Sequence, residues 1–217
     1  MDWWVYAAAA LCGYLLGSLP TGYLVGKAKG VDIRAVGSGN IGATNVLRAL
    51  GKPAGAFVLL MDALKGALGC WLPRVAVPKL LSQEGSLNPE LLSLAGGLGA
   101  ILGHNYTCWL RFKGGKGVAT SAGVLLVLMP RAVGVCLGLW LLVLAATRYV
   151  SVASVAAAVA LPFVVWAWRG SPAMVILSAA VGGLVVKRHR TNLQRLVAGT
   201  EHRLGQQPGQ PSQPIDQ

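Results

Sequence analysis

An apolar run without a charged side chain extends from Trp3 to Gly26, and it constrains the fold more than any other feature. The run exceeds the roughly 20 residues that a helix needs to cross a bilayer, and Trp3 and Trp4 suit the membrane interface. Further apolar runs fill most of the chain, which is 54% hydrophobic and 12% charged, with a mean hydropathy of +0.59. We therefore predict an all-α, polytopic membrane protein. The first run lacks a basic flank and a small-residue cleavage site, which favours a retained helix over a signal peptide.

Breakers and charges divide the chain into seven expected transmembrane helices, near residues 3–26, 54–73, 91–110, 115–130, 132–149, 151–168 and 172–187. Only Pro130 and Arg131 interrupt residues 118–147, so one long helix is the alternative to the fourth and fifth spans. We expect one membrane domain over residues 1–204 and a disordered tail over 205–217, which is rich in Gln, Pro and Gly.

The basic residues favour one orientation in the membrane. With the amino terminus outside, Arg74, Lys79, Arg131 and Arg169 lie on the outer side and Lys65 lies within a span. The other fourteen of the 19 Lys and Arg residues then lie on the cytoplasmic side, together with the carboxyl terminus. This asymmetry agrees with the positive-inside rule, and fusing the fourth and fifth spans would place the basic carboxyl terminus outside.

Three stretches combine glycine, small polar side chains and positive charge. The first, residues 37–48, reads Gly-Ser-Gly-Asn-Ile-Gly-Ala-Thr-Asn-Val-Leu-Arg and contains G-x-G-x-x-G. A dinucleotide site is excluded, because an expected membrane helix precedes the glycines where that fold needs a strand. We expect backbone N–H groups and a helix start that favour an anion, with Thr44 and Asn45 able to cap the helix and Arg48 one turn on. A tight interhelical turn is the alternative.

The second stretch, residues 112–117, reads Phe-Lys-Gly-Gly-Lys-Gly. It is not a nucleotide P-loop, because Leu110 stands where that motif has its first glycine and Gly117 where it has Ser or Thr. Lys113 and Lys116 bracket two glycines at the start of a short helix, so they can face a phosphate from both sides. A basic interhelical loop is the alternative.

The third stretch runs from Lys187 to Arg195, after the last expected span. His189, Asn192 and Arg195 are spaced by three, so they share a face if the helix continues, and a histidine can bond a hydroxyl or a phosphate. The alternative is a charge cluster that stops transfer across the membrane. In this topology all three stretches lie on the cytoplasmic face, where they could form one shared site.

Two further polar groups fall inside expected spans. Asp62 and Lys65 are i and i+3 in the second span, where an isolated charge costs roughly 2.5–3.5 kcal/mol, so we expect them to neutralise each other. We interpret His104, at the inner end of the third span, as structural.

Several classes of function do not fit. Nucleic-acid binding is excluded because the net charge of +12 is spread over short loops. The four cysteines lie in apolar segments without ligand-like spacing, so we expect no disulfide, no metal site and no cofactor. An anion transporter should repeat a pair of broken helices in two halves, and we find no such repeat. A non-catalytic lipid-binding module would need basic loops only, without Asn, Ser and His at fixed positions.

Three motifs carry a resemblance to a known family. The first is Gly-Ser-Gly-Asn-x-Gly-Ala-Thr-Asn-x-x-Arg at 37–48, and the second is Gly-His at 103–104 before Phe-Lys-Gly-Gly-Lys-Gly-Val-Ala-Thr at 112–120. The third is His-Arg-x-Asn-x-x-Arg-Leu-x-x-Gly-x-Glu at 189–201. The chain resembles the bacterial acyl-phosphate-dependent glycerol-3-phosphate acyltransferases of the cytoplasmic membrane, with their three signatures in order over nearly its whole length. The resemblance implies seven spans and a cytoplasmic active site. Ile41 and Thr107 stand where the family often has Pro, which concerns loop stiffness.

The resemblance implies transfer of a fatty acyl group from acyl phosphate to the 1-hydroxyl of sn-glycerol 3-phosphate, which gives lysophosphatidic acid and phosphate, the first step of phospholipid synthesis. It assigns catalytic roles to Ser38, Arg48, Lys116, His189 and Asn192. The expected substrate-binding positions are Gly37, Gly39, Asn40, Gly42, Thr44, Asn45, Lys113, Gly114, Gly115, Arg195 and Glu201, with either Ser151 or Ser154. Membrane lipid surrounds such an enzyme, which we expect to act as a monomer, with contact to the enzyme that makes acyl phosphate left open.

The route of the proton has two alternatives. The H-x-x-x-x-D dyad of other glycerolipid acyltransferases is absent, because Trp109 follows His104 at that spacing and Gln194 follows His189. A hydroxyl that attacks a mixed anhydride needs an acceptor for its proton, whereas phosphate is already a good leaving group. We expect the donor's phosphate to accept the proton, with His189 as the alternative base, so the protein supplies positioning and electrostatics.

Overall fold

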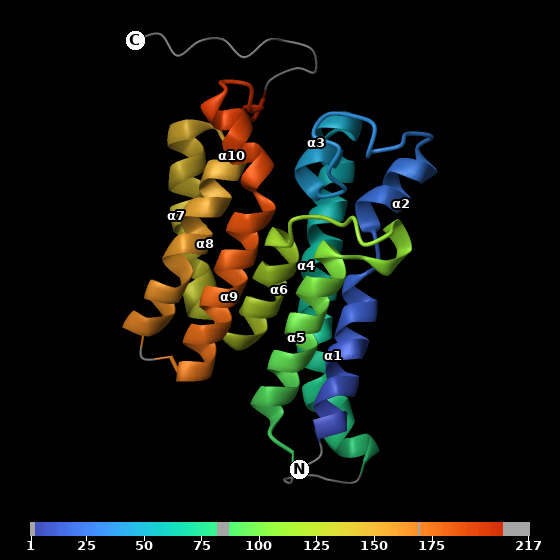
Figure 1. Cartoon of the computed structure of the whole chain (residues 1–217), viewed down its shortest axis with the longest axis vertical. Coiled ribbons are helices and arrows are strands. Elements are labelled where there is room, and N and C mark those ends of the chain that lie inside the picture. The colour runs from blue at the N-terminus through green and yellow to red at the C-terminus, as the bar shows by residue number, and fades with distance from the viewer. Residues whose placement is uncertain (1–2, 82–86, 169, 206–217) are drawn as a thin grey trace. The chain divides into compact units, whose positions relative to one another are not determined.

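The structure, a computed structural model, describes residues 3–81, 87–168 and 170–205, and every regular element in these ranges is a helix (Figure 1). The elements are α1 (Trp3–Gly17), α2 (Thr21–Ala28), α3 (Ala43–Leu50), α4 (Lys52–Leu80), α5 (Pro89–Asn105), the 3-10 turn η1 (Cys108–Leu110), α6 (Val118–Leu128), α7 (Pro130–Thr147), α8 (Val150–Ala167), α9 (Pro172–Arg188) and α10 (Arg190–Val197). The all-α prediction is confirmed for the described residues. Residues 206–217 of the expected tail, and Arg169, lie outside them.

The chain divides into two compact units, which are described separately. The first, Met1–Leu128, contains α1 to α6, and the second, Met129–Gln217, contains α7 to α10. In the second unit α8 packs against both α7 and α9. The single domain expected over residues 1–204 stays a prediction.

Glycines bring α1 and α5 into backbone contact in the first unit. A Cβ at Gly13 would collide with the carbonyl of Gly96, and one at Gly17 with the carbonyl of Ala100. Because the two sets of positions rise together, α1 and α5 run in the same direction. Close approach through small residues is typical of helices in membranes, where burial of apolar area does not drive association.

Helix α4 is longer than the span expected over residues 54–73, since it begins at Lys52 and continues through Pro73 to Leu80. A Cβ at Gly69 would lie 2.7 Å from Cβ of Ala100, and one at Gly96 would lie 2.7 Å from Cγ of Pro73. Positions along α4 and α5 therefore rise in opposite directions, so α4 is antiparallel to α5. Neighbouring helices make a proline tolerable inside a helix of this kind.

The helix expected over residues 3–26 is interrupted, which corrects the prediction. Helix α1 ends at Gly17 and α2 begins at Thr21. Pro20 lacks an N–H group and disfavours the helical backbone at Leu19, so the break falls directly before it. The break exposes the carbonyl groups of Ser18 and Leu19 to bonds from other segments.

The described residues contain four apolar helical stretches of at least 18 residues, if α1 and α2 are counted together: Trp3–Ala28, Lys52–Leu80, Pro130–Thr147 and Val150–Ala167. The alternative of one long helix over 118–147 is wrong, because the backbone leaves the helical region at Met129. Helix α6 has only 11 residues where a span was expected over 115–130. At 1.5 Å per residue it is roughly 16 Å long, against roughly 30 Å for the hydrocarbon core.

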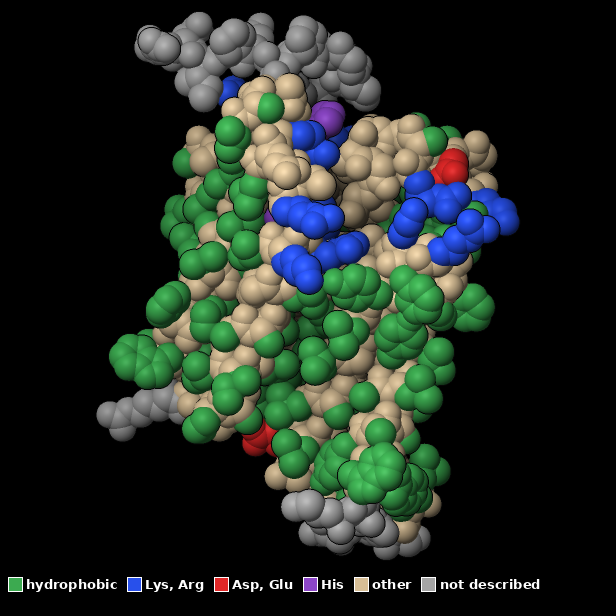
Figure 2. Space-filling model, in the orientation of Figure 1, with side chains coloured by type: hydrophobic (Ala, Val, Ile, Leu, Met, Phe, Trp, Pro, Cys, Tyr) green, Lys and Arg blue, Asp and Glu red, His purple; other side chains and the backbone are tan. Residues whose placement is uncertain are grey.

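Charge is distributed unevenly over the first unit. On the face shown in Figure 2, hydrophobic side chains cover the length of the helices, and Lys and Arg side chains gather at the end that carries α2 and the loop before α3. Lys27, Lys29 and Arg34 are exposed there. The glycine-rich first stretch therefore lies at the basic end of its unit.

Candidate active site

The side chain of Asn45 bonds to the backbone of the loop before α3 and is only 2% exposed. Its Nδ2 donates to the carbonyls of Ile33 and Val36 at 3.0 Å each, and its Oδ1 accepts the N–H of Ser38 at 2.9 Å. Three of the four hydrogen bonds available to an amide thus go to the loop backbone. Asn45, expected to bind substrate, fixes the backbone that carries Ser38.

The start of α3 differs from the prediction. Gly42 is the N-cap, and no side chain caps the helix, so the prediction that Thr44 or Asn45 caps it is wrong. Both residues lie in the first turn, and the amide of Asn45 is committed to the loop. The half-buried Arg48 lies one turn further along α3, as expected.

The expected cradle of backbone N–H groups over 37–42 is smaller than predicted. Besides Ser38, Gly42 donates its N–H to Oδ1 of Asn40 at 2.8 Å and Gly39 donates to the carbonyl of Val36 at 3.0 Å. Gly37 and Gly39 have φ values of 57° and 68°, which other residues rarely adopt. The glycines therefore shape a loop that is largely bonded to itself and that presents the half-buried Ser38.

The second stretch lies on the end of α5. Gly115 donates its N–H to the carbonyl of His104 at 3.0 Å, and Gly114 donates to that of Asn105 at 3.2 Å. A Cβ at Gly115 would collide with the imidazole of His104, and one at Gly114 with the carbonyl of His104. The two glycines are thus required by close packing, and Lys113 and Lys116 flank the packed segment.

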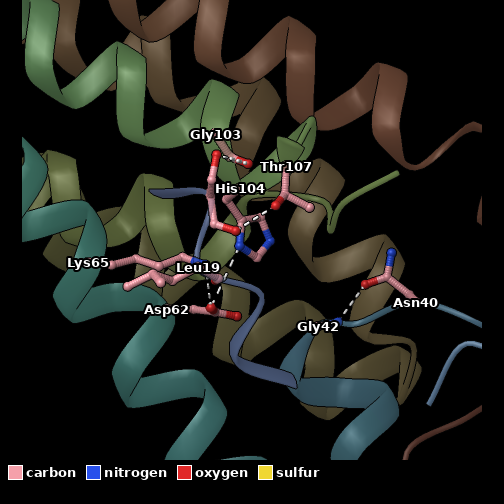
Figure 3. A network of polar contacts seen from close by, with 9 residues as sticks. Leu19, Asn40, Gly42, Asp62, Lys65, Gly103, His104 and Thr107 are labelled. Atoms are coloured by element: carbon pink, nitrogen blue, oxygen red, sulfur yellow. Dashed lines mark hydrogen bonds and ion pairs between the residues drawn. The ribbon is translucent and has the colours of Figure 1, made fainter. Parts of the chain in front are cut away.

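A buried polar network surrounds His104 (Figure 3). Nζ of Lys65 lies 2.8 Å from Oδ1 of Asp62, which confirms the predicted pair, and it donates to the carbonyl of Leu19 at 2.7 Å. Nδ1 of His104 lies 3.6 Å from the same carboxylate oxygen. Thr107 donates its hydroxyl to the carbonyl of Ser18 at 2.5 Å. The network ties the break between α1 and α2 to the end of α5.

In the second unit, Glu201 bonds to two residues of the third stretch, Asn192 and Arg195. Its Oε1 accepts bonds from Oγ of Ser151 at 2.8 Å and from Nδ2 of Asn192 at 2.6 Å. Its Oε2 accepts a bond from Nε of Arg195 at 2.9 Å. Burial alone would raise the pKa of Glu201, but the bonds from Asn192, Arg195 and Ser151 outweigh it and hold the pKa below its usual value of 4.5. Glu201 and Arg195, both expected to bind substrate, bond to each other.

The two candidate serines are separated by this geometry. Ser151 shares the carboxylate of Glu201 with Asn192. Ser154 lies one turn along α8, where its hydroxyl accepts a bond from Nε1 of Trp140 at 3.2 Å and donates to the carbonyl of Val150 at 2.8 Å. The structure therefore brings Ser151, and not Ser154, to the polar cluster of the third stretch.

His189 lies at the junction of two helices, because α9 ends at Arg188 and α10 begins at Arg190. The prediction that His189, Asn192 and Arg195 share a face required a continuous helix, and the helix is interrupted here. Asn192 and Arg195 nevertheless both bond to the carboxylate of Glu201. Nδ1 of His189 lies 2.8 Å from the carbonyl of Val185. A carbonyl can only accept, so Nδ1 carries a proton and donates this bond.

Sequence reasoning missed the segment that follows Glu201. The side chain of Arg203 donates to the hydroxyl of Tyr149 at 3.0 Å, and its guanidinium lies 5.3 Å from that ring's centre. The N–H of Leu204 donates to the carbonyl of Arg148 at 2.7 Å. These contacts fasten the segment to the start of α8, and an isolated arginine near a chain end carries no signal that would predict them.

The first unit thus contains the first and second stretches, and the second unit contains the third stretch with Ser151. Since the units are described separately, the single shared site stays a prediction.

Comparisons with known proteins place the chain in a family. A family described as glycerol-3-phosphate acyltransferase matches residues 7–199. Relatives named glycerol-3-phosphate acyltransferase are 49% identical over 95% of this chain and 97% of their own in Synechococcus sp., and 48% identical over 87% and 92% in Geotalea daltonii. The crystal structure of PlsY, an integral membrane glycerol 3-phosphate acyltransferase in its glycerol 3-phosphate form, superposes with a TM-score of 0.80 at 38% identity, over 92% of this chain and 96% of that chain. The chain belongs to the glycerol-3-phosphate acyltransferase family.

Proposed function

We propose that the protein is an integral membrane enzyme that transfers a fatty acyl group from acyl phosphate to the 1-hydroxyl of sn-glycerol 3-phosphate. The observation that carries the proposal is the pair of glycine loops in the first unit. Each loop is bonded to a buried residue beneath it, Asn45 or His104, and each adjoins positive charge, from Arg48 or from Lys113 and Lys116. Two anionic substrates require two fixed positive regions of this kind.

The arrangement in the membrane follows from the charge asymmetry. We propose seven crossings of the bacterial cytoplasmic membrane, with the amino terminus outside and the reacting residues on the cytoplasmic side. The parallel course of α1 and α5 and the opposite course of α4 support alternate crossings. Labelling of single cysteines in intact cells tests this topology: positions 40 and 114 should be protected and position 170 should react.

The catalytic roles are divided between contact and support. Ser38, Arg48, Lys116, His189 and Asn192 contact the substrates, and Ser151 joins them because it shares Glu201 with Asn192. Asn45, Glu201 and Arg195 hold other residues in place.

The reaction needs little covalent chemistry from the protein. The 1-hydroxyl oxygen of glycerol 3-phosphate attacks the acyl carbonyl carbon, the bond from that carbon to the phosphate oxygen breaks, and the hydroxyl proton ends on the released phosphate. Lys and Arg side chains neutralise the phosphates and orient the hydroxyl, which is where the rate enhancement arises. His189 donates or accepts one hydrogen bond to the acceptor substrate through Nε2.

The decisive experiment supplies purified protein with palmitoyl phosphate and glycerol 3-phosphate and measures lysophosphatidic acid. Product with palmitoyl phosphate, and none with palmitoyl coenzyme A or palmitoyl acyl carrier protein, is the expected result. Formation of product from a thioester donor alone would show that the donor is wrong while the acyl transfer stands.

Substitutions of single lysine and arginine residues test which positive charges bind the substrates. Lys116→Ala and Arg48→Ala should each lose about one to two decades in kcat/KM, because a charge-assisted hydrogen bond contributes roughly 1.5–3 kcal/mol. Lys29→Ala, an exposed change at the end of α2, is the control and should stay near the parent. Activity of both site variants within threefold of the parent would remove these residues from the site.

A further inference from the structure

The buried ion pair on α4 makes more contacts than neutrality requires. Asp62 and Lys65 are 2% and 6% exposed, and a pair spaced by i and i+3 can satisfy both charges within one helix. Lys65 nevertheless also donates to the carbonyl of Leu19, and Asp62 also faces Nδ1 of His104 (Figure 3). The pair therefore links α4 to the break between α1 and α2 and to the end of α5.

His104 is the member of this network that the loop 113–117 contacts. Its carbonyl accepts the N–H of Gly115, and its imidazole lies where a side chain at position 115 would have to go. Asn105 provides the next contact, since it accepts the N–H of Gly114. The backbone of the loop is thus fitted to two consecutive residues of α5, one of which is held by the α4 ion pair.

We infer that His104 is a positioning residue for the loop 113–117, kept in place by the Asp62–Lys65 pair, and that it determines where Lys113 and Lys116 present their charge. The inference rests on the proposed acyl transfer for its kinetic measurement. Since the two lysines bracket the fitted glycines, a displacement of the loop moves both ammonium groups. A shift of about 1 Å at a substrate-binding group can lower a rate by about a hundredfold.

A polar support is suited to this task. An apolar replacement of a buried ion pair often leaves a protein equally stable or more stable, so stability alone does not explain why charges lie here. The bond from Lys65 to the carbonyl of Leu19 is directional, whereas apolar contacts are not, and Asp62 adds an electrostatic contact with Nδ1 of His104 at 3.6 Å. The role of the pair is therefore to fix the positions of these segments, and not to add to the free energy of folding.

A double-mutant cycle tests the inference. Gly115→Ala places a methyl group against the imidazole and should raise KM for the phosphorylated substrates at least tenfold with a smaller change in kcat. His104→Ala removes the support and should also raise KM. Combined with His104→Ala, the Gly115→Ala change should add less than threefold, because the added methyl group occupies the space that the imidazole leaves.

Gly114→Ala is the matched control. Its methyl group would collide with the backbone carbonyl of His104, which no substitution of that side chain removes. Its effect should therefore multiply with that of His104→Ala. If Gly114→Ala and Gly115→Ala raised KM by the same factor in the His104→Ala background, the inference would be overturned.

A second measurement does not depend on activity. Trypsin should cut the folded protein at Lys113 faster in His104→Ala, and in Asp62→Asn combined with Lys65→Met, than in the parent. An unchanged cleavage rate in both would also overturn the inference. If His104→Ala does not yield folded protein, His104→Asn replaces it, since it also empties the space beneath Gly115. A parent without acyl transfer would refute the proposed function, and the cleavage rates would still decide whether His104 positions the loop.

Discussion

Glu201 allows a quantitative test, because two substitutions remove different parts of its bonding. Its carboxylate is 3% exposed and accepts one bond each from Ser151, Asn192 and Arg195. Glu201→Ala removes all three bonds, so the buried donors of Ser151 and Asn192 lose this acceptor. Each buried, unsatisfied donor costs about 1–3 kcal/mol, so the two together cost about 2–6 kcal/mol. Arg195 is partly exposed and can turn to water, so its share is about 1 kcal/mol or less.

Glu201→Gln should be much milder. The amide oxygen can replace Oε1, which in the parent accepts both Ser151 and Asn192. The amide nitrogen then faces Nε of Arg195, and only that bond is lost. We expect Glu201→Gln to retain most of the stability that Glu201→Ala loses, with a difference between them of about 2–6 kcal/mol.

Thermal unfolding in detergent measures this difference, with modification of the buried Cys136 as the reporter within the second unit. At about 2–4 °C per kcal/mol for a chain of this size, Glu201→Ala should melt on the order of 10 °C below the parent and Glu201→Gln only a few degrees below. The same melting temperature for the two variants would refute the reasoning, because it would show that the acceptor at Oε1 does not support Ser151 and Asn192.

Four further expectations concern single positions. Folding lowers the pKa of Glu201, so the stability that its ionised form contributes is complete above the usual pKa of 4.5 and is lost as pH falls through the folded pKa. Over that acidic range the melting temperature should fall more in the parent than in Glu201→Gln. Gly13→Ala, whose Cβ meets the carbonyl of Gly96, should lower the melting temperature by several degrees, whereas Gly183→Ala, with open space around it, should not. Ser151→Ala should reduce kcat/KM at least tenfold and Ser154→Ala less than threefold, and the reverse order in the acyltransfer assay would favour Ser154. His189→Ala should raise KM for glycerol 3-phosphate more than it lowers kcat, with partial recovery in His189→Gln; a loss in kcat alone would identify the histidine as the base.

The helical class could be predicted because long apolar runs and their breakers are local signals. The break between α1 and α2 was also within reach, since Pro20 marks it. It was missed because the apolar run continues past the proline, and hydropathy does not distinguish one helix from two in series. The length of α6 was missed for the opposite reason: residues 115–117 are glycine-rich loop that packs on α5, and only tertiary contact excludes them from the helix.

The bonds that the candidate residues make within the protein could not be predicted from the sequence. Asn45 was assigned to substrate by resemblance, yet its amide bonds to Ser38, seven residues earlier. Glu201 was assigned to substrate by resemblance, yet it bonds to Ser151, which is 50 residues away. The residue type in a motif is the same whether its carboxylate or amide contacts a ligand or another part of the protein. Only the folded chain shows which of the two it does.

The three stretches share one physical arrangement. A buried polar side chain lies beneath each, Asn45, His104 or Glu201, and each is at most 4% exposed. In the first two stretches the residue proposed to meet substrate, Ser38 or Lys116, is more exposed and depends on that support for its position. Anion-binding loops that are rich in glycine gain close approach to a phosphate, but glycine also makes them flexible, so a bare loop would lose entropy when substrate orders it. Directional bonds from a buried residue order the loop during folding, and less of the binding energy of the substrates then has to be used for ordering.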